Sequence, residues 1–169
     1  AREGETMATL DEVDRSFTAD DLLICDADGP VAVAGVMGGL GTEIRPDTEQ
    51  VLIECAYFDP RSIRRTSRRL GLHTDSSHRF ERGVDPEAIP RVLASAASLI
   101  AELGGGAAAT TAIDRIATPF EPKSIRFRPS RAARLLGTPV SKEESLRILE
   151  SLGCRVVEKG DASITVQAP

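Results

Sequence analysis

One acidic residue stands out because its neighbours are apolar. Glu54 lies within the run Val51-Leu52-Ile53-Glu54-Cys55-Ala56-Tyr57-Phe58, whose apolar and β-favouring residues predict a buried strand. Side chains alternate between the two faces of a strand, so Glu54 shares one face with Leu52 and Phe58. A buried, unpaired charge costs several kcal/mol. We therefore expect a partner, a raised pKa or a ligand at this carboxyl.

Two further segments carry residues suited to ligand binding. Gly38 and Gly39 are paired glycines that let the backbone approach another group closely. The stretch His73-Thr74-Asp75-Ser76-Ser77-His78 holds both histidines of the chain among hydroxyl groups. A carboxylate, a bare backbone and a hydroxyl-rich loop together predict one small pocket. For the histidines themselves we favour a structural interpretation, as side chains that hold the loop by hydrogen bonds.

A row of arginines lies on one expected helix. Asp59-Pro60 is typical of a helix start, and Gly71 of a helix end. The arginines in between recur at helical spacing: Arg61, Arg64, Arg65 and Arg68. Such a row is suited to phosphate groups, including those of a nucleic acid. Arginine-rich faces also serve solubility and pairing with carboxylates, so this second interpretation stays open.

Metal and nucleotide chemistry find little support in the residues. The three cysteines, Cys25, Cys55 and Cys154, are far apart with no CxxC spacing, and two histidines are too few for a typical zinc site. We expect buried, reduced thiols and no metal site. No GxGxxG sequence and no Walker lysine occurs, so no nucleotide-binding loop is expected.

Charge is unevenly distributed along the 169 residues, whose net charge is -5. Residues 1–122 hold 12 basic and 21 acidic side chains, whereas residues 123–169 hold 9 and 5. An acidic larger part argues against general coating of nucleic acid but not against a local contact. No apolar run reaches transmembrane length, so no membrane partner is expected, and the reduced cysteines predict a cytoplasmic protein. The first residues include neither an initiator Met nor a signal peptide, which predicts a fragment of a larger protein.

The pattern of the first part predicts an α+β fold with a mixed or antiparallel sheet packed with helices. Strands are expected at 5–10, 15–17, 22–25, 31–37 and 107–116. Asp85-Pro86 opens what we expect to be the main core helix, which ends at Gly104. The extended residues 118–122 are expected to separate a first domain, 1–117, from a second, 123–169.

The second part has the pattern of a small winged-helix-like α+β module. A strand is expected at 125–128, helices at 130–136 and after Ser141, and a hairpin from 155–158 and 163–167. This order is compatible with a winged helix-turn-helix. An independent DNA-binding regulator would need a basic recognition helix, and the segment 143–152 carries three glutamates instead.

Three motifs together resemble a known family. Gly35-Val36-Met37-Gly38-Gly39, Val51-Leu52-Ile53-Glu54-Cys55-Ala56 and the run from Gly71 to Pro86 closely resemble the beta subunit of bacterial phenylalanine–tRNA ligase. Residues 1–6 are similar to the same family, and residues 129–169 are similar to the small domain that follows its editing domain. The likeness covers essentially the whole chain in the family's order.

The resemblance implies proofreading, that is, hydrolysis of tyrosine wrongly esterified to phenylalanine tRNA. It also implies an alpha subunit as partner, in an assembly of two alpha and two beta chains. ATP and magnesium serve that intact assembly, and no cofactor is expected in this fragment. We therefore expect an aminoacyl-tRNA ligase subunit, an enzyme component with an ester-hydrolysing editing site.

By the same resemblance, Glu54 receives the tyrosine hydroxyl, helped by the backbone at Gly38 and Gly39. Thr74 and Ser76 line the same pocket in the family, although alanine is common where this chain has Ser76. The family's editing site also uses a histidine and polar residues that precede the first residue of this chain. No catalytic residue is therefore assigned here, and little activity is expected from the fragment alone. The alternative is a structural or tRNA-docking scaffold with a degenerate pocket.

Overall fold

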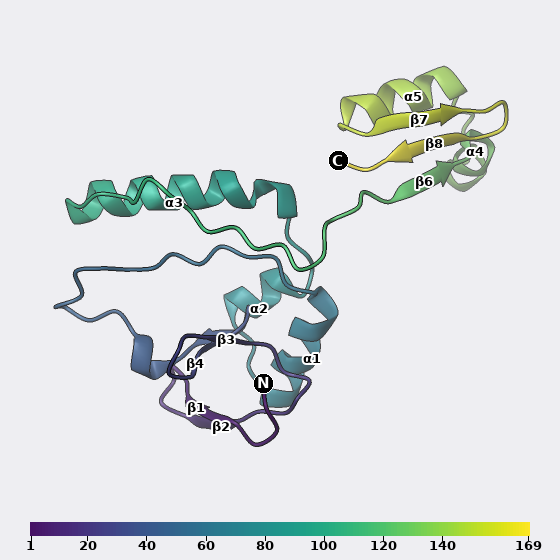
Figure 1. Cartoon of the computed structure of the whole chain (residues 1–169). Helices are drawn as coiled ribbons and strands as arrows, with labels where there is room; N and C mark the ends of the chain where they lie inside the picture. Colours follow the sequence, from purple (N-terminus) through teal and green to yellow (C-terminus); the bar gives the residue numbers. More distant parts are fainter. The chain divides into compact units, whose positions relative to one another are not determined.

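A computed structural model describes residues 1–169, which divide into two compact units, residues 1–112 and 113–169. Each unit combines helices with antiparallel strands (Figure 1). The predicted α+β class is therefore confirmed. No helix has both the length and the apolar character needed to cross a membrane.

The first unit opens with two small antiparallel sheets. Strands β1 (Thr6–Ala8) and β2 (Asp14–Ser16) pair as a hairpin. Strands β3 (Leu23–Cys25), β4 (Pro30–Val33) and β5 (Met37–Gly38) form a sheet in that order, followed by the short 3₁₀ helix η1 (Leu40–Thr42). A single strand predicted over 31–37 divides into β4 and β5, because Gly35 has a φ of 65° and turns the chain between them.

Helix α1 (Pro60–Leu70) begins and ends where the sequence predicts. The Asp59 side chain accepts a hydrogen bond from the Ser62 N–H at 3.1 Å, and Gly71 closes the helix with a left-handed φ of 67°. The following residues differ from the prediction of a loop. They form the helix α2 (Asp75–Phe80), because Thr74 and Ser77 make a reciprocal capping box at its start.

The core of this unit lies between the strands and α1. Its buried members are Phe17, Val33, Val36, Ile63 and Leu72. Phe58 and Phe80 pack against them, with ring centroids 5.1 Å apart. A Cβ at Gly35 would lie 3.0 Å from the Phe58 ring and 3.1 Å from Ile63, so a glycine lets the turn approach the core closely.

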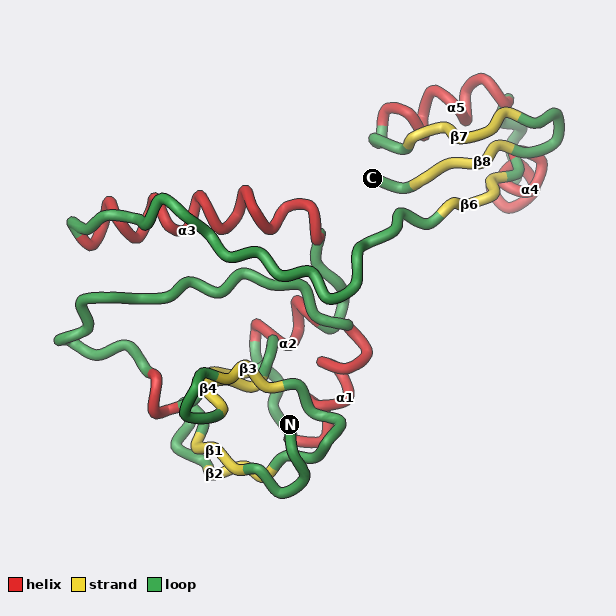
Figure 2. The backbone as a smooth tube through the Cα atoms, in the orientation of Figure 1, coloured by secondary structure: helices red, strands yellow, loops and turns green.

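Two predicted strands are absent, and both predictions are wrong for this structure. Residues 43–59 run as one irregular segment, drawn as a continuous loop in Figure 2, and residues 106–123 are also without strand. Leu52 is 95% exposed and Ile113 is 86% exposed. A β-favouring sequence forms a strand only when a neighbouring strand accepts its hydrogen bonds, and neither segment has such a neighbour here.

The predicted main core helix forms but does not lie in the core. The 3₁₀ helix η2 (Pro86–Ala88) leads into α3 (Ile89–Gly104), whose C-terminal cap is Gly105. None of its residues is buried, and its exposed apolar side chains are Val92, Leu99, Ile100 and Leu103. The helical period is therefore correct and the predicted burial is wrong, because no element packs over the apolar face.

The second unit contains the predicted strand, helices and hairpin. Its elements are β6 (Ser124–Phe127), α4 (Pro129–Leu136), α5 (Lys142–Ser151), β7 (Arg155–Lys159) and β8 (Ile164–Gln167). The sheet order is β6-β8-β7, so β8 is central and supplies the buried Ile164 and Val166. The winged-helix arrangement stays a prediction.

The cysteines are reduced but not uniformly buried. Cys25 is exposed, whereas Cys55 and Cys154 are half-buried. The prediction of buried thiols is wrong for Cys25, which is the last residue of the edge strand β3.

Candidate functional site

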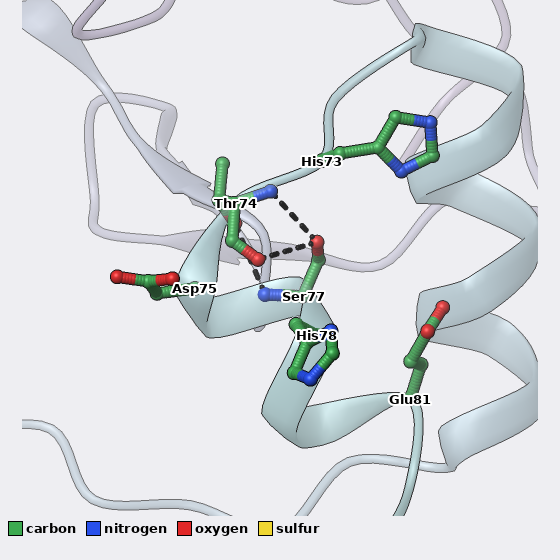
Figure 3. A pocket seen from close by; sticks show the side chains of 6 residues that line it. All are labelled: His73, Thr74, Asp75, Ser77, His78 and Glu81. Carbon is green, nitrogen blue, oxygen red and sulfur yellow. Dashed lines mark hydrogen bonds between the residues drawn. The ribbon is translucent and has the colours of Figure 1, made fainter.

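A pocket of about 240 Å³ opens beside the start of α2 (Figure 3). It holds two imidazoles, two carboxylates and two hydroxyls, and its lining residues are His73, Thr74, Asp75, Ser77, His78 and Glu81. All of these residues except Glu81 lie in the stretch 73–78 that the sequence predicted to contribute to a pocket. Within that stretch Thr74 was assigned to the ligand, whereas Ser77 was given no role of its own. The T-x-x-S spacing of a capping box was the signal that would have placed Ser77 at the helix start.

Hydrogen bonds at Thr74 fix the shape of this pocket. The Thr74 hydroxyl accepts from the Ser77 N–H at 3.0 Å and donates to the Val36 carbonyl at 2.7 Å. The Ser77 hydroxyl in turn accepts from the Thr74 N–H at 3.0 Å (Figure 3). The bond to Val36 joins α2 to the Gly35–Gly39 segment, so two of the three segments predicted to form a pocket do lie together.

Glu54 is the third component, and it lies outside the lining of this pocket. Its residue is exposed on the irregular segment 43–59, which corrects the expectation of an acid on a buried strand face. Neighbouring protein atoms still desolvate the Glu54 carboxyl, and this raises its pKa above the ordinary value. The segment is held on the C-terminal side of Glu54, because Cys55 Sγ donates to the Ile89 carbonyl at 3.8 Å and Phe58 packs against the core.

The backbone at Gly38 and Gly39 approaches other groups closely, as paired glycines allow. Those groups belong to the protein itself, so the space beside the glycines is already filled. A Cβ at Gly39 would lie 2.7 Å from the Val31 carbonyl oxygen and 2.8 Å from Met7 Sδ. The Gly38 carbonyl accepts a hydrogen bond from the Leu10 N–H at 3.1 Å. Ser76 is half-buried on α2 and does not line the pocket.

The arginines of α1 lie on its outer side, and Arg69 rather than the four predicted residues makes an ion pair. Arg61, Arg64, Arg65 and Arg68 are all exposed. Arg69 pairs with Asp21, a side chain only 2% exposed that sequence reasoning did not single out.

Asp21 is surrounded by donors. Its carboxylate accepts from the Thr18 N–H at 2.8 Å and from the Thr66 hydroxyl at 2.9 Å, besides Arg69. Desolvation raises the pKa of Asp21, but the hydrogen bonds from Thr18, Thr66 and Arg69 outweigh it and lower the pKa below its ordinary value. This network ties α1 to the strand region that precedes it.

The side chains are not arranged as a metal centre. No group of three or more histidine, cysteine, aspartate or glutamate side chains is placed to hold a metal ion. What the arrangement offers is a polar pocket on α2, a desolvated carboxyl nearby in sequence, and a cationic helix face.

Comparison with known proteins places this architecture in a family. Residues 1–105 match the B3/4 domain, and residues 125–169 match the tRNA synthetase B5 domain. Because the first match spans more than half of the chain, the chain belongs to the B3/4 domain family.

The most similar relatives include proteins named phenylalanine–tRNA ligase beta subunit. The chain is 49% identical to the subunit of Salinibacter ruber over 161 residues. These aligned residues make up 95% of this chain and 19% of the relative. The chain is 47% identical over 169 residues to the subunit of Carboxydothermus hydrogenoformans, covering 100% of this chain and 21% of the relative. The resemblance to this subunit is therefore confirmed, and the chain spans about a fifth of the length of the curated relatives it matches.

Proposed function

We propose that this chain is the amino-acid-recognising part of a proofreading site in a phenylalanine–tRNA ligase beta subunit. The site would bind tyrosine that has been wrongly esterified to phenylalanine tRNA and help to hydrolyse the ester. Support comes from the two domain families in their order and from relatives of nearly half identical sequence.

The chemistry of the substrate explains why one carboxyl matters. Phenylalanine and tyrosine differ by one hydroxyl, which an apolar synthetic pocket cannot exclude fully, so a second site that binds the hydroxyl can remove the error. A carboxylate without a partner is satisfied by the phenol of tyrosine and left unsatisfied by phenylalanine. Such a site therefore favours the wrong amino acid, as proofreading requires.

The observation that carries the proposal is the state of Glu54. Desolvation alone accounts for its raised pKa, with no hydrogen bond or neighbouring charge contributing. Glu54 is an exposed residue whose carboxyl is therefore free to accept a donor. In the proposed site of the longer subunit Glu54 accepts the phenol hydroxyl, the backbone at Gly38 and Gly39 assists, and Thr74 and Ser76 line the remainder. Of these only Thr74 lines the pocket in this chain, so the proposal requires the glycine backbone and Ser76 to become accessible in the subunit.

Glu54 is exposed in this chain because its segment has no strand to pair with. The segment 51–58 has the composition of a strand but no neighbouring strand, while the relatives are about five times longer than the chain. We propose that pairing of this segment within the longer subunit brings Glu54 to the pocket beside Thr74. The partners proposed for that subunit are an alpha subunit and phenylalanine tRNA, in the cytoplasm, with ATP and magnesium serving the whole assembly.

The division of labour within the chain is part of the same proposal. Residues 1–117 act as the editing domain, and residues 123–169 act as a separate small domain. The hydrolytic step is assigned to no residue of this chain.

The test is the amino-acid preference of a beta subunit that contains these residues. Tyrosine and phenylalanine binding are measured by calorimetry for the unchanged protein, for Glu54→Ala and for the control Glu49→Ala, which removes an exposed acid from the same segment. We expect tyrosine to bind more tightly, and Glu54→Ala to reduce that preference by about 1–3 kcal/mol. The control should leave it unchanged.

The opposite outcome would favour the scaffold. Equal binding of the two amino acids, unaffected by Glu54→Ala, would show a degenerate pocket that serves only to shape or dock the protein.

A further inference from the structure

Helix α1 separates its charges from its buried residues completely. At about 100° per residue, its five arginines fall within an arc of about 140°. The opposite side holds the buried Ile63, Thr66 and Ser67, which face the core and the Asp21 network. The helix contains no acidic residue, so nothing on it neutralises the arginine side.

The structure shows which of these charges are already paired. Arg69 is neutralised by Asp21. Arg65 makes only a long contact of 3.5 Å to the Asp20 carbonyl. Arg61, Arg64 and Arg68 take part in none of the ion pairs of the chain, although residues 1–50 supply 12 acidic and only 3 basic side chains. Pairing with carboxylates, which the sequence left open together with solubility as the alternative to phosphate binding, therefore accounts for Arg69 alone.

We propose that Arg61, Arg64, Arg65 and Arg68, here called the arginine ridge, form a contact surface for the phosphodiester backbone of RNA. This proposal deepens the proposed function, on which it rests, by naming a surface that would hold the tRNA. The ridge extends over two helical turns, about 10 Å, and so reaches more than one phosphate.

The residue types favour phosphate as the ligand. Every basic side chain in residues 1–122 is an arginine. The planar guanidinium binds phosphate oxygens in a bidentate manner, which a lysine does not. Helix α1 carries no aromatic side chain on which a base would stack. The ridge therefore contacts the backbone without reading the bases.

The opposite side of α1 argues against a lipid surface as the ligand. A helix that lies in a membrane interface inserts an exposed apolar face between the headgroups. The apolar side of α1 is instead in the protein core, through Ile63, which is 1% exposed. A rigid cationic ridge with no apolar face fits a polyanion in water. Because α1 packs against α2, the ridge and the pocket lie on adjoining helices of the same unit (Figure 1).

The experiment compares two double variants that remove the same charge from different places. Arg64→Gln with Arg68→Gln alters the ridge, whereas Arg45→Gln with Arg91→Gln removes two exposed arginines elsewhere in the same unit. Binding of the 169-residue chain to a fluorescent oligouridylate and to a phenylalanine tRNA transcript is followed by anisotropy at several salt concentrations. Circular dichroism checks that each variant is folded.

We expect the ridge variant to bind both RNAs about tenfold more weakly, with the slope of log affinity against log salt reduced by about 1.4 for the single strand. The control variant should bind within about twofold of the unchanged chain. Should the ridge variant fail to fold, Arg64→Lys with Arg68→Lys keeps the charge and loses the bidentate geometry, and an intermediate affinity is expected.

Three results would overturn the proposal: no RNA binding by the unchanged chain at low salt, equal losses in the two double variants, or ridge-dependent binding to phosphatidylserine vesicles in place of RNA. The tyrosine test of the proposed function is independent of these, since the ridge variant leaves Glu54 intact. If the unchanged protein bound tyrosine and phenylalanine equally but its RNA affinity still depended on the ridge, the proofreading site would be rejected and the ridge proposal would stand.

Discussion

Asp21 shows how much of the packing in the first unit depends on one side chain. It is buried, and it receives hydrogen bonds from Thr18, Thr66 and Arg69, residues separated by up to 48 positions in the chain. A buried carboxylate is tolerated only when such donors satisfy it. The arginine ridge is therefore positioned by an interaction on the other side of the same helix.

We predict that Asp21→Ala lowers the free energy of unfolding by about 3 kcal/mol, because the buried donors around it lose their acceptor. Urea unfolding monitored by circular dichroism measures the loss. Asp20→Ala, which removes the exposed neighbouring carboxylate, should change stability by less than about 0.5 kcal/mol. Similar losses in the two variants would contradict the role given to Asp21.

The lowered pKa of Asp21 also predicts a pH dependence. A carboxyl whose pKa is depressed in the folded state stabilises the fold above its ordinary pKa, near 3.8, and this contribution is lost as the pH falls through the folded pKa. The stability difference between the unchanged chain and Asp21→Asn should therefore be constant from neutral pH down to that value and shrink below it. Urea midpoints taken at a series of pH values test this, and a difference that grows on acidification would refute it.

Among the elements, helix α1 could be predicted from the sequence, whereas the conformation of segment 51–58, which contains Glu54, could not. Helix ends are set by local residues, here an aspartate cap, a proline in the first turn and a closing glycine, so the sequence contains all that is needed. A strand depends on a partner strand from any other part of the chain, and the composition of 51–58 says nothing about whether such a partner is present. The stretch 73–78, which supplies most of the pocket lining, could thus be found from the sequence, while the part of Glu81 and the placement of Glu54 relative to Thr74 could not.

We predict that Asp59→Ala destabilises the chain by about 1 kcal/mol, since the Ser62 N–H loses its capping acceptor. Asp59→Asn keeps a capping oxygen and should restore most of the loss. Thermal unfolding of the two variants measures the difference. If alanine and asparagine had equal effects, the cap would not be the source of the stability.

At the scale of the whole molecule, the chain consists of two units with separate cores. The first centres on Phe17, Val36 and Ile63, and the second on Ile164 and Val166 of its central strand. Composition and spacing indicated two parts with opposite charge, because residues 1–122 are acidic and 123–169 basic. They did not indicate that the apolar face of α3 would be left uncovered, since burial depends on what packs over a helix and not on its period.

The irregular residues that connect the units predict where the chain is cut by trypsin. Arg115 and Lys123 are exposed and lie outside any helix or strand. Their backbone can therefore bind in the active site of a protease without prior local unfolding. The arginines of α1 are equally exposed but belong to a capped helix, which must unfold locally before cleavage. Arg45 is also in an irregular segment, but it precedes Pro46 and is therefore a poor site. We expect brief digestion followed by mass spectrometry to show cleavage after Arg115 and Lys123 before any cleavage within α1 or the β7–β8 hairpin. Earlier cleavage within α1 or within the β7–β8 hairpin would show that these units do not hold together as separate folded bodies.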